Sequence, residues 1–142
     1  MKLLSIVVLI LGIIALTSVL TVYWQIRQQD PTFLKEEFIP MDVKVEDHFG
    51  FNTDTDAIHF GKVPPQNEAI KSFNLTNTYQ FAVVAELSIH GAIAPWVSAT
   101  ENTVYLEPNM QKKVNLTVTI PDATPYGQYY GTLRVVFRRD SP

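Results

Sequence analysis

Three histidines carry the most versatile chemistry in this sequence, because an imidazole binds metal ions and exchanges protons near neutral pH. His48, His59 and His90 are too far apart along the chain to match a standard zinc motif. A copper site of the cupredoxin type would need a cysteine, and the chain has none. We therefore expect solvated or strand-edge histidines, with a copper site that includes Met41 or Met110 as the alternative.

Oxygen ligands are concentrated between Asn52 and Asp56, where their spacing is that of the first three ligand positions of a calcium-binding loop. The pattern then fails, because Ala57 stands where the loop needs glycine and Val63 where it needs glutamate. A polar turn is the preferred interpretation, and a weak cation site is the alternative. The sequence has no phosphate-binding glycine loop, HExxH or GxSxG motif. We predict no catalytic residue, no cofactor and no metal site.

Two asparagines stand in the Asn-x-Ser/Thr motif that accepts N-linked glycans. They are Asn74, in Asn74-Leu75-Thr76, and Asn115, in Asn115-Leu116-Thr117. Apolar and polar residues alternate around both motifs, which predicts outward-facing asparagines. Because so short a motif also arises by chance, both are candidates for glycosylation and no more.

The composition excludes several classes of protein. The chain has 142 residues, which suits one folded domain. Lys plus Arg is 11 and Asp plus Glu is 14, a net charge of −3, so we expect no nucleic-acid partner. A hydrophobic share of 46% is too high for a disordered chain. Without cysteine, the domain has no disulfide framework and must hold by packing.

The excess of apolar residues lies at the start of the chain. Residues 3–24 include no charged side chain, and a helix of this length spans the bilayer core. Tyr23 and Trp24 at its end, with Arg27 after it, are expected to be membrane-interface anchors. We predict that residues 1–24 form a retained transmembrane signal-anchor helix in contact with membrane lipid. A cleaved signal peptide is the main alternative.

Placement outside the cytoplasm is the preferred orientation, although the basic residues flanking the helix are nearly balanced. The remainder of the chain is acidic and has no reason to face an anionic cytoplasmic leaflet. Residues 25–40 are predicted to be a juxtamembrane linker. Asp30 and Pro31 are suited to start a short helix with Phe33, Leu34 and Phe38 on one face, either resting on the membrane or docking a partner.

From residue 41 to residue 142 apolar and polar residues alternate, which is typical of strands with one buried face. Clear runs cover 73–76, 83–89, 114–120 and 129–137, and shorter ones cover 41–47, 57–60, 96–99 and 104–106. Seven or eight short strands predict an all-β domain, an immunoglobulin-like antiparallel β-sandwich preceded by one transmembrane helix, with a small barrel as the rival. The predicted core is Phe60, Phe73, Leu75, Val83, Ala85, Leu87, Ile89, Trp96, Leu106, Val114, Leu116, Val118, Tyr129, Leu133, Val135 and Phe137.

The order of turns and core residues resembles known modules. Phe60-Gly61-Lys62-Val63-Pro64-Pro65, Leu106-Glu107-Pro108 and Gly127-Gln128-Tyr129-Tyr130-Gly131 are similar to Ig-like modules associated with alpha-galactosidases, and to the major-sperm-protein-like group, in archaeal and bacterial envelope proteins. The resemblance covers roughly residues 56–138 and implies spacers or partner-binding platforms without catalysis. It also implies that Tyr129 is a corner tyrosine, with Gly131 in place of the usual cysteine.

Three functions follow as expectations. The first is a single-pass cell-membrane protein whose external Ig-like domain acts as a non-catalytic structural or protein-interaction module of the cell envelope. The second is an accessory or stator subunit of a pilus- or archaellum-type complex. The third is a metal- or ligand-binding receptor domain. Val84 and Val136 add apolar surface to outward faces and are candidates for a partner-facing sheet, although isolated exposed valines are common.

Overall fold

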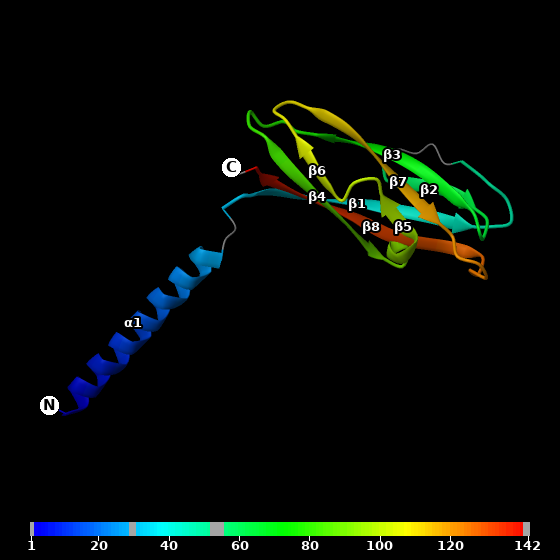
Figure 1. Cartoon of the computed structure of the whole chain (residues 1–142). Coiled ribbons are helices and arrows are strands. Elements are labelled where there is room, and N and C mark those ends of the chain that lie inside the picture. Colours follow the sequence, from blue (N-terminus) through cyan, green and yellow to red (C-terminus); the bar gives the residue numbers. More distant parts are fainter. Residues whose placement is uncertain (1, 29–30, 52–55, 141–142) are drawn as a thin grey trace. The chain divides into compact units, whose positions relative to one another are not determined.

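The computed structural model describes residues 2–28, 31–51 and 56–140, with side chains described for 6–27 in the helix. The chain divides into two compact units, Met1–Pro31 and Thr32–Pro142. Each unit has its own architecture, one helical and one built from strands (Figure 1).

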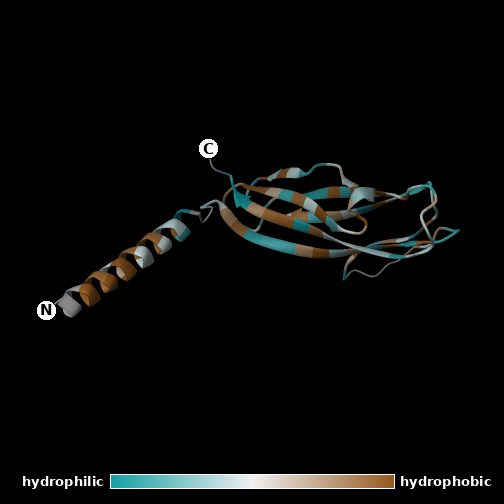
Figure 2. Cartoon of the chain, turned by 90° about the horizontal axis from the view of Figure 1, so that it is seen from below, coloured by the Kyte–Doolittle hydropathy of each residue, from teal (hydrophilic) through white to brown (hydrophobic). Residues whose placement is uncertain are grey.

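The first unit is the helix α1, Lys2–Gln28. Its segment Ile6–Arg27 is long and apolar enough to cross a membrane, and its side chains are exposed. Figure 2 shows hydrophobic residues along most of its length. The hydroxyls of Ser18 and Thr21 donate to the carbonyls of Ile14 and Thr17, each at 2.8 Å, so these polar groups are satisfied within the helix.

The second unit consists of two β-sheets, which confirms the predicted all-β domain at that level. The sheet orders are β2-β1-β8-β4-β6 and β3-β7-β5, and among the described strands only β1 and β2 pair in parallel. A short 3₁₀ turn, η1 (Ala94–Trp96), precedes β5. The strands are β1 (Phe33–Val45), β2 (Ile58–Val63), β3 (Glu68–Thr76), β4 (Val83–Gly91), β5 (Val97–Ala99), β6 (Thr103–Leu106), β7 (Gln111–Thr119) and β8 (Gly127–Arg139).

Strand β1 begins inside the stretch expected to be a linker. It pairs with β8 from Phe33↔Arg138 to Val45↔Gly127. The predicted linker 25–40 and its short helix are therefore replaced by strand from Phe33 onward, whereas Asp30 lies outside the described residues. The reason is a partner distant in sequence: β8 offers backbone hydrogen bonds that outweigh the local helix signal.

The core lies between the two sheets and contains most of the predicted residues. Phe73, Ile89, Trp96 and Tyr129 are only partly buried against it. The core also includes side chains that the sequence analysis did not assign, namely Met41, Val43, Val45, Ile58, Val63, Ile93, Val97, Val104 and Ile120. Most of these additions come from β1 and β2 and from residues beside short strands, where the alternation is brief.

Candidate functional site

The end of α1 places the three predicted interface residues close together. The guanidinium of Arg27 lies 5.7 Å from the centre of the Tyr23 ring, a cation–π distance. Trp24 is 66% exposed, so its ring is free to lie at a bilayer surface. The assignment of Tyr23, Trp24 and Arg27 as membrane-interface anchors stays a prediction.

Several loops meet at one end of the sandwich, which we call the loop end. Residues 46–57 join β1 to β2, residues 64–67 join β2 to β3, and residues 120–126 join β7 to β8. The pairings Val45↔Gly127 and Glu68↔Thr119 place the start of the first connection, and both of the other two, at the same end. Strand β1 enters the sheet at the opposite end and points toward the loop end (Figure 1).

Exposed aromatic side chains gather at the loop end. Phe51 is 97% exposed, and Phe49 and Tyr126 are 55% and 66% exposed. Gly50 between the two phenylalanines forms a bridge with Lys62, in which the Lys62 amide donates to the Gly50 carbonyl at 2.7 Å. This bridge fixes the backbone beside both rings. These two rings were not predicted, although two phenylalanines that flank a glycine in a polar stretch indicate exposed apolar side chains.

A second feature of the loop end is an ionic cluster around Glu46. The Glu46 carboxylate accepts hydrogen bonds from Lys44 and from Lys62, whose Nζ lies 2.8 Å away. These hydrogen bonds lower the pKa of Glu46 to about 2. His48 contacts Asp47 at 2.7 Å through Nδ1, and this contact lowers the pKa of Asp47. The charges therefore fix the first residues of the 46–57 loop.

The imidazole of His59 is held between two carboxylates. Its Nδ1 lies 2.7 Å from Oδ2 of Asp42 on β1, and its Nε2 lies 2.9 Å from Oδ1 of Asp56 in the loop. Because a carboxylate accepts hydrogen bonds, both ring nitrogens have to donate, which requires the imidazolium form. The hydrogen bond to Asp56, with a smaller effect from Asp42, raises the pKa of His59 against desolvation. His59 therefore ties the end of the 46–57 loop to β1.

At His59 this geometry is suited to holding the loop against β1 and not to catalysis. Both ring nitrogens are hydrogen-bonded to carboxylates, so neither is available to take a proton from a nucleophile. His48 and His90 belong to other contacts, the latter with the Ser88 hydroxyl at 3.2 Å. Within the described ranges, no group of three or more His, Asp or Glu is arranged to hold a metal ion. The calcium-like stretch lies outside the described residues except for Asp56.

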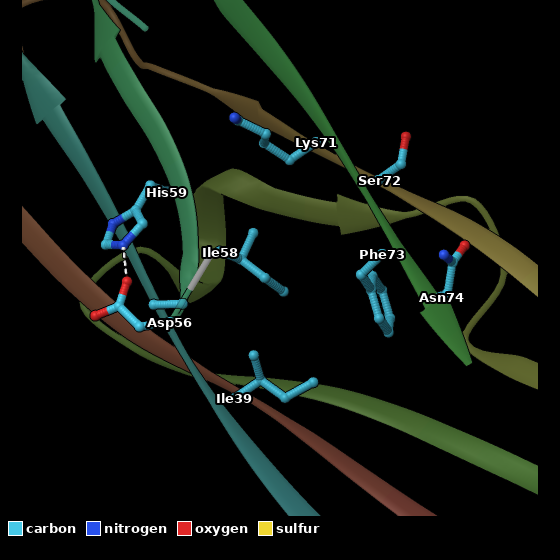
Figure 3. A pocket seen from close by; sticks show the side chains of 9 residues that line it. Ile39, Asp56, Ile58, His59, Lys71, Ser72, Phe73 and Asn74 are labelled. Carbon is cyan, nitrogen blue, oxygen red and sulfur yellow. Dashed lines mark hydrogen bonds and ion pairs between the residues drawn. The ribbon is translucent and has the colours of Figure 1, made fainter. Parts of the chain in front are cut away.

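A cavity of about 480 Å³ opens at the side of the sandwich, between the start of β2 and the middle of β3; we call it the side cavity. Its apolar lining comes from Ile39, Ile58 and Phe73. Polar side chains, among them Asp56 and His59, lie at its rim (Figure 3). Figure 3 shows His59 and Ser72 on separate strands with no contact drawn between them.

The two candidate glycosylation sites lie on the outer face of the three-stranded sheet. Asn74 is exposed on β3, which is at the sheet edge, and Asn115 is exposed on the central strand β7. The Asn115 Oδ1 accepts a hydrogen bond from the Ser72 hydroxyl at 2.8 Å. Both asparagines therefore face outward, but their surroundings differ.

The suggested apolar face around Val136 is covered in the structure. Val136 is only 4% exposed. It is in register with Glu36 on β1 and Glu86 on β4, and these two carboxylates pair with Arg134 and Arg138. The long arginine side chains cover the valine, so this position offers no partner-facing apolar surface.

Comparison with known proteins identifies no relative: no family model matches the chain, and no curated protein matches it. Function therefore has to be inferred from the elements and side chains of the chain itself.

Proposed function

We propose that this protein is a single-pass membrane protein whose Ig-like domain is displayed outside the cytoplasm as a non-catalytic structural or protein-interaction module of the cell envelope. The observation that carries the proposal is that the chain combines two unlike units: an apolar helix long enough to cross a membrane and a β-domain that starts at Phe33. A helix with its apolar side chains exposed needs a lipid environment.

The strand pairing supports the Ig-like assignment. In antibody domains one sheet contains strands B, E and D side by side, and the other contains C, F and G. The neighbours β3-β7-β5 correspond to B-E-D, and β4 beside β8 corresponds to C beside F. Strand β1 then takes the place of G on the other side of β8. The first strand of the domain thus occupies the position that the last strand holds in antibodies.

Tyr129 gives independent support. It lies near the start of β8, and its hydroxyl donates to the carbonyl of Pro125 at 2.9 Å. A tyrosine corner has this arrangement at the start of strand F. Two residues later, a Cβ on Gly131 would lie 2.6 Å from Cγ1 of Ile93, so Ile93 fills the space beside the position where antibodies have a cysteine.

The exposed aromatics at the loop end support a protein partner. Aromatic residues are enriched at the centres of protein interfaces, because they bury a large area with few rotatable bonds. Phe49, Phe51 and Tyr126 lie at the end of the sandwich opposite Phe33, where the chain arrives from the helix. A module that holds its partner there would serve either as a stand-alone envelope protein or as an accessory subunit of a larger membrane complex.

Photo-crosslinking tests this partner contact. Benzoylphenylalanine in place of Phe51 is expected to give one discrete adduct in membranes of intact cells. The matched control replaces Phe38, which is 63% exposed on the outer face of β1 and away from the loop end. Equal adducts from both positions, or none from Phe51, would contradict a partner site at the loop end.

A further inference from the structure

Strand β3 lies at the edge of the three-stranded sheet. Strand β3 pairs with β7 along one side only, from Glu68↔Thr119 to Thr76↔Gln111. Residues 71–74 of β3 line the side cavity, across which β2 begins at Ile58, whereas residues 68–71 line a second cavity together with Phe49 and Phe51. A nine-residue edge of this kind presents backbone groups that invite pairing with another chain, and folded proteins usually cover such an edge.

Asn74 lies on this edge strand with both parts of its motif accessible. The asparagine and Thr76 are exposed, and Leu75 between them is buried in the core at 3%. Across the described residues, no hydrogen bond engages the Asn74 carboxamide. An enzyme approaching from the open side of β3 therefore reaches both the amide and the threonine hydroxyl.

Asn115 is exposed but has more neighbours than Asn74. Strand β7 lies between β3 and β5. The Asn115 side chain accepts a hydrogen bond from Ser72, and its backbone carbonyl accepts one from the Thr100 hydroxyl at 2.9 Å. Thr117 of the same motif is half-buried beside Ser98 of β5. The Asn115 motif is therefore less accessible than the Asn74 motif.

We propose that Asn74, and not Asn115, is an N-glycan acceptor, and that the glycan shields the edge of β3 beside the side cavity. The proposal rests on the extracytoplasmic placement of the domain. In the transfer, the Asn74 Nδ2 forms a bond to the anomeric carbon of a lipid-phosphate-linked sugar. The bond from that carbon to the phosphate oxygen breaks, the electron pair leaves with the lipid phosphate, and a base of the transferase takes one amide proton.

The position of Asn74 explains what the sugar does. A glycan is bulky and hydrated, so a glycan on the edge strand β3 prevents a strand of another chain from pairing with it. The lining of the side cavity includes both Asn74 and the apolar Phe73, Ile39 and Ile58 (Figure 3). The attached sugar therefore lies next to apolar surface that is otherwise open to solvent.

Intact mass of the full chain tests the proposal, using N74Q and N115Q as a matched pair in a host that glycosylates a co-expressed reporter. Each chain also contains T119C, an exposed position that gives the cysteine-free protein a single thiol. The thiol reports placement through its reaction with a membrane-impermeant maleimide on intact cells. We expect one glycan mass on the parent chain and on N115Q, and its complete loss from N74Q.

The outcomes separate the two proposals. A thiol that reacts on intact cells together with an unmodified Asn74, or with a glycan on Asn115, overturns the glycan assignment and leaves the external placement standing. A thiol that reacts only after lysis contradicts the external placement on which the glycan depends. Increased self-association of purified N74Q, but not of N115Q, would show that the sugar covers the edge; equal behaviour would overturn that role.

Discussion

The indole of Trp96 packs edge-on against the ring of Tyr129, with ring centroids 4.9 Å apart and ring planes at 66°. This geometry is the favourable one for an aromatic pair, in which a positive ring edge meets a negative face. Trp96 belongs to η1 and Tyr129 to β8, so the contact fastens the turn between β4 and β5 to the start of β8. The Tyr129 hydroxyl then fixes the β7–β8 loop through Pro125.

The contribution of the Tyr129 hydrogen bond to stability should be measurable separately from that of the aromatic ring. Tyr129→Phe keeps the ring contact with Trp96 and removes the bond to the Pro125 carbonyl. We expect the free energy of unfolding to fall by about 1 kcal/mol. Tyr130→Phe is the matched control, because this neighbouring side chain is 64% exposed, and it should leave the denaturation midpoint unchanged. Equal effects in the two variants would show that Tyr129 contributes only its ring.

Asn77 is a buried polar side chain that connects several backbone groups at the end of the sandwich opposite the loop end. It is 1% exposed, and its Nδ2 donates to the carbonyls of Phe81, Leu106 and Glu107 while its Oδ1 accepts from the Tyr79 amide. Asn77→Ala would leave these buried groups without partners, at a cost of about 3 kcal/mol. Urea denaturation should show this loss. Asn102→Ala, at an exposed side chain, is the control expected to change little.

The pairing of β1 with β8 predicts at which residue a separately expressed domain has to begin. Residues 32–142 include all of β1, whereas residues 41–142 lack the part that pairs with β8 between Arg138 and Thr132. We expect the longer fragment to unfold cooperatively and the shorter one to lose its cooperative transition, because half of a central sheet ladder is missing. Calorimetry of both fragments decides the point. Similar melting curves would mean that residues 33–40 are dispensable for the fold.

The clamp at His59 predicts a stability that depends on pH. Its pKa is raised in the folded protein, so the folded state holds the proton more tightly than the unfolded state. The resulting stabilisation is full below the unfolded pKa of about 6.5 and is lost as the pH rises through the folded value. Melting temperatures should therefore fall above about pH 6.5.

Two variants isolate this effect. His59→Gln removes the titrating ring, which should flatten the decline in melting temperature. His90→Gln, at an exposed histidine whose ring contacts Ser88, should retain the decline of the parent chain. Groups near His59 that titrate or carry charge are Asp42, Asp56 and Lys71, together with Tyr130, which is in register with Asp42. An unchanged decline in His59→Gln would show that His59 is not the source of the pH dependence.

The strands with regular alternation were predictable from sequence, and those without it were not. Leu133, Val135 and Phe137 alternate with polar residues and mark β8 clearly. The start of β1 has three consecutive charges, Lys35 to Glu37, and no such period. These charges are accommodated by distant partners: Glu36 pairs with Arg134, and Lys35 lies 4.4 Å from the centre of the Phe137 ring.

The same limit applied to the candidate site. The sequence did not connect His59 with Asp42 or Asp56, which reach it through the parallel pairing of β1 with β2 and through the loop. The parallel pairing of β1 with β2 could not be predicted from the spacing of residues along the chain, because no local feature fixes the register of the two strands. The apolar helix and the two glycosylation motifs needed no tertiary information, and these the sequence shows directly.

Display of the domain outside the cytoplasm is the central claim, and labelling of T119C in intact cells tests it most directly. The chain has no other thiol, and Thr119 is exposed at the end of β7. We predict that a membrane-impermeant maleimide labels the protein fully before lysis, and that the labelled protein at full mass stays with the membranes after an alkaline carbonate wash. Labelling only after lysis, or release of a chain shortened by the helix, would contradict the account.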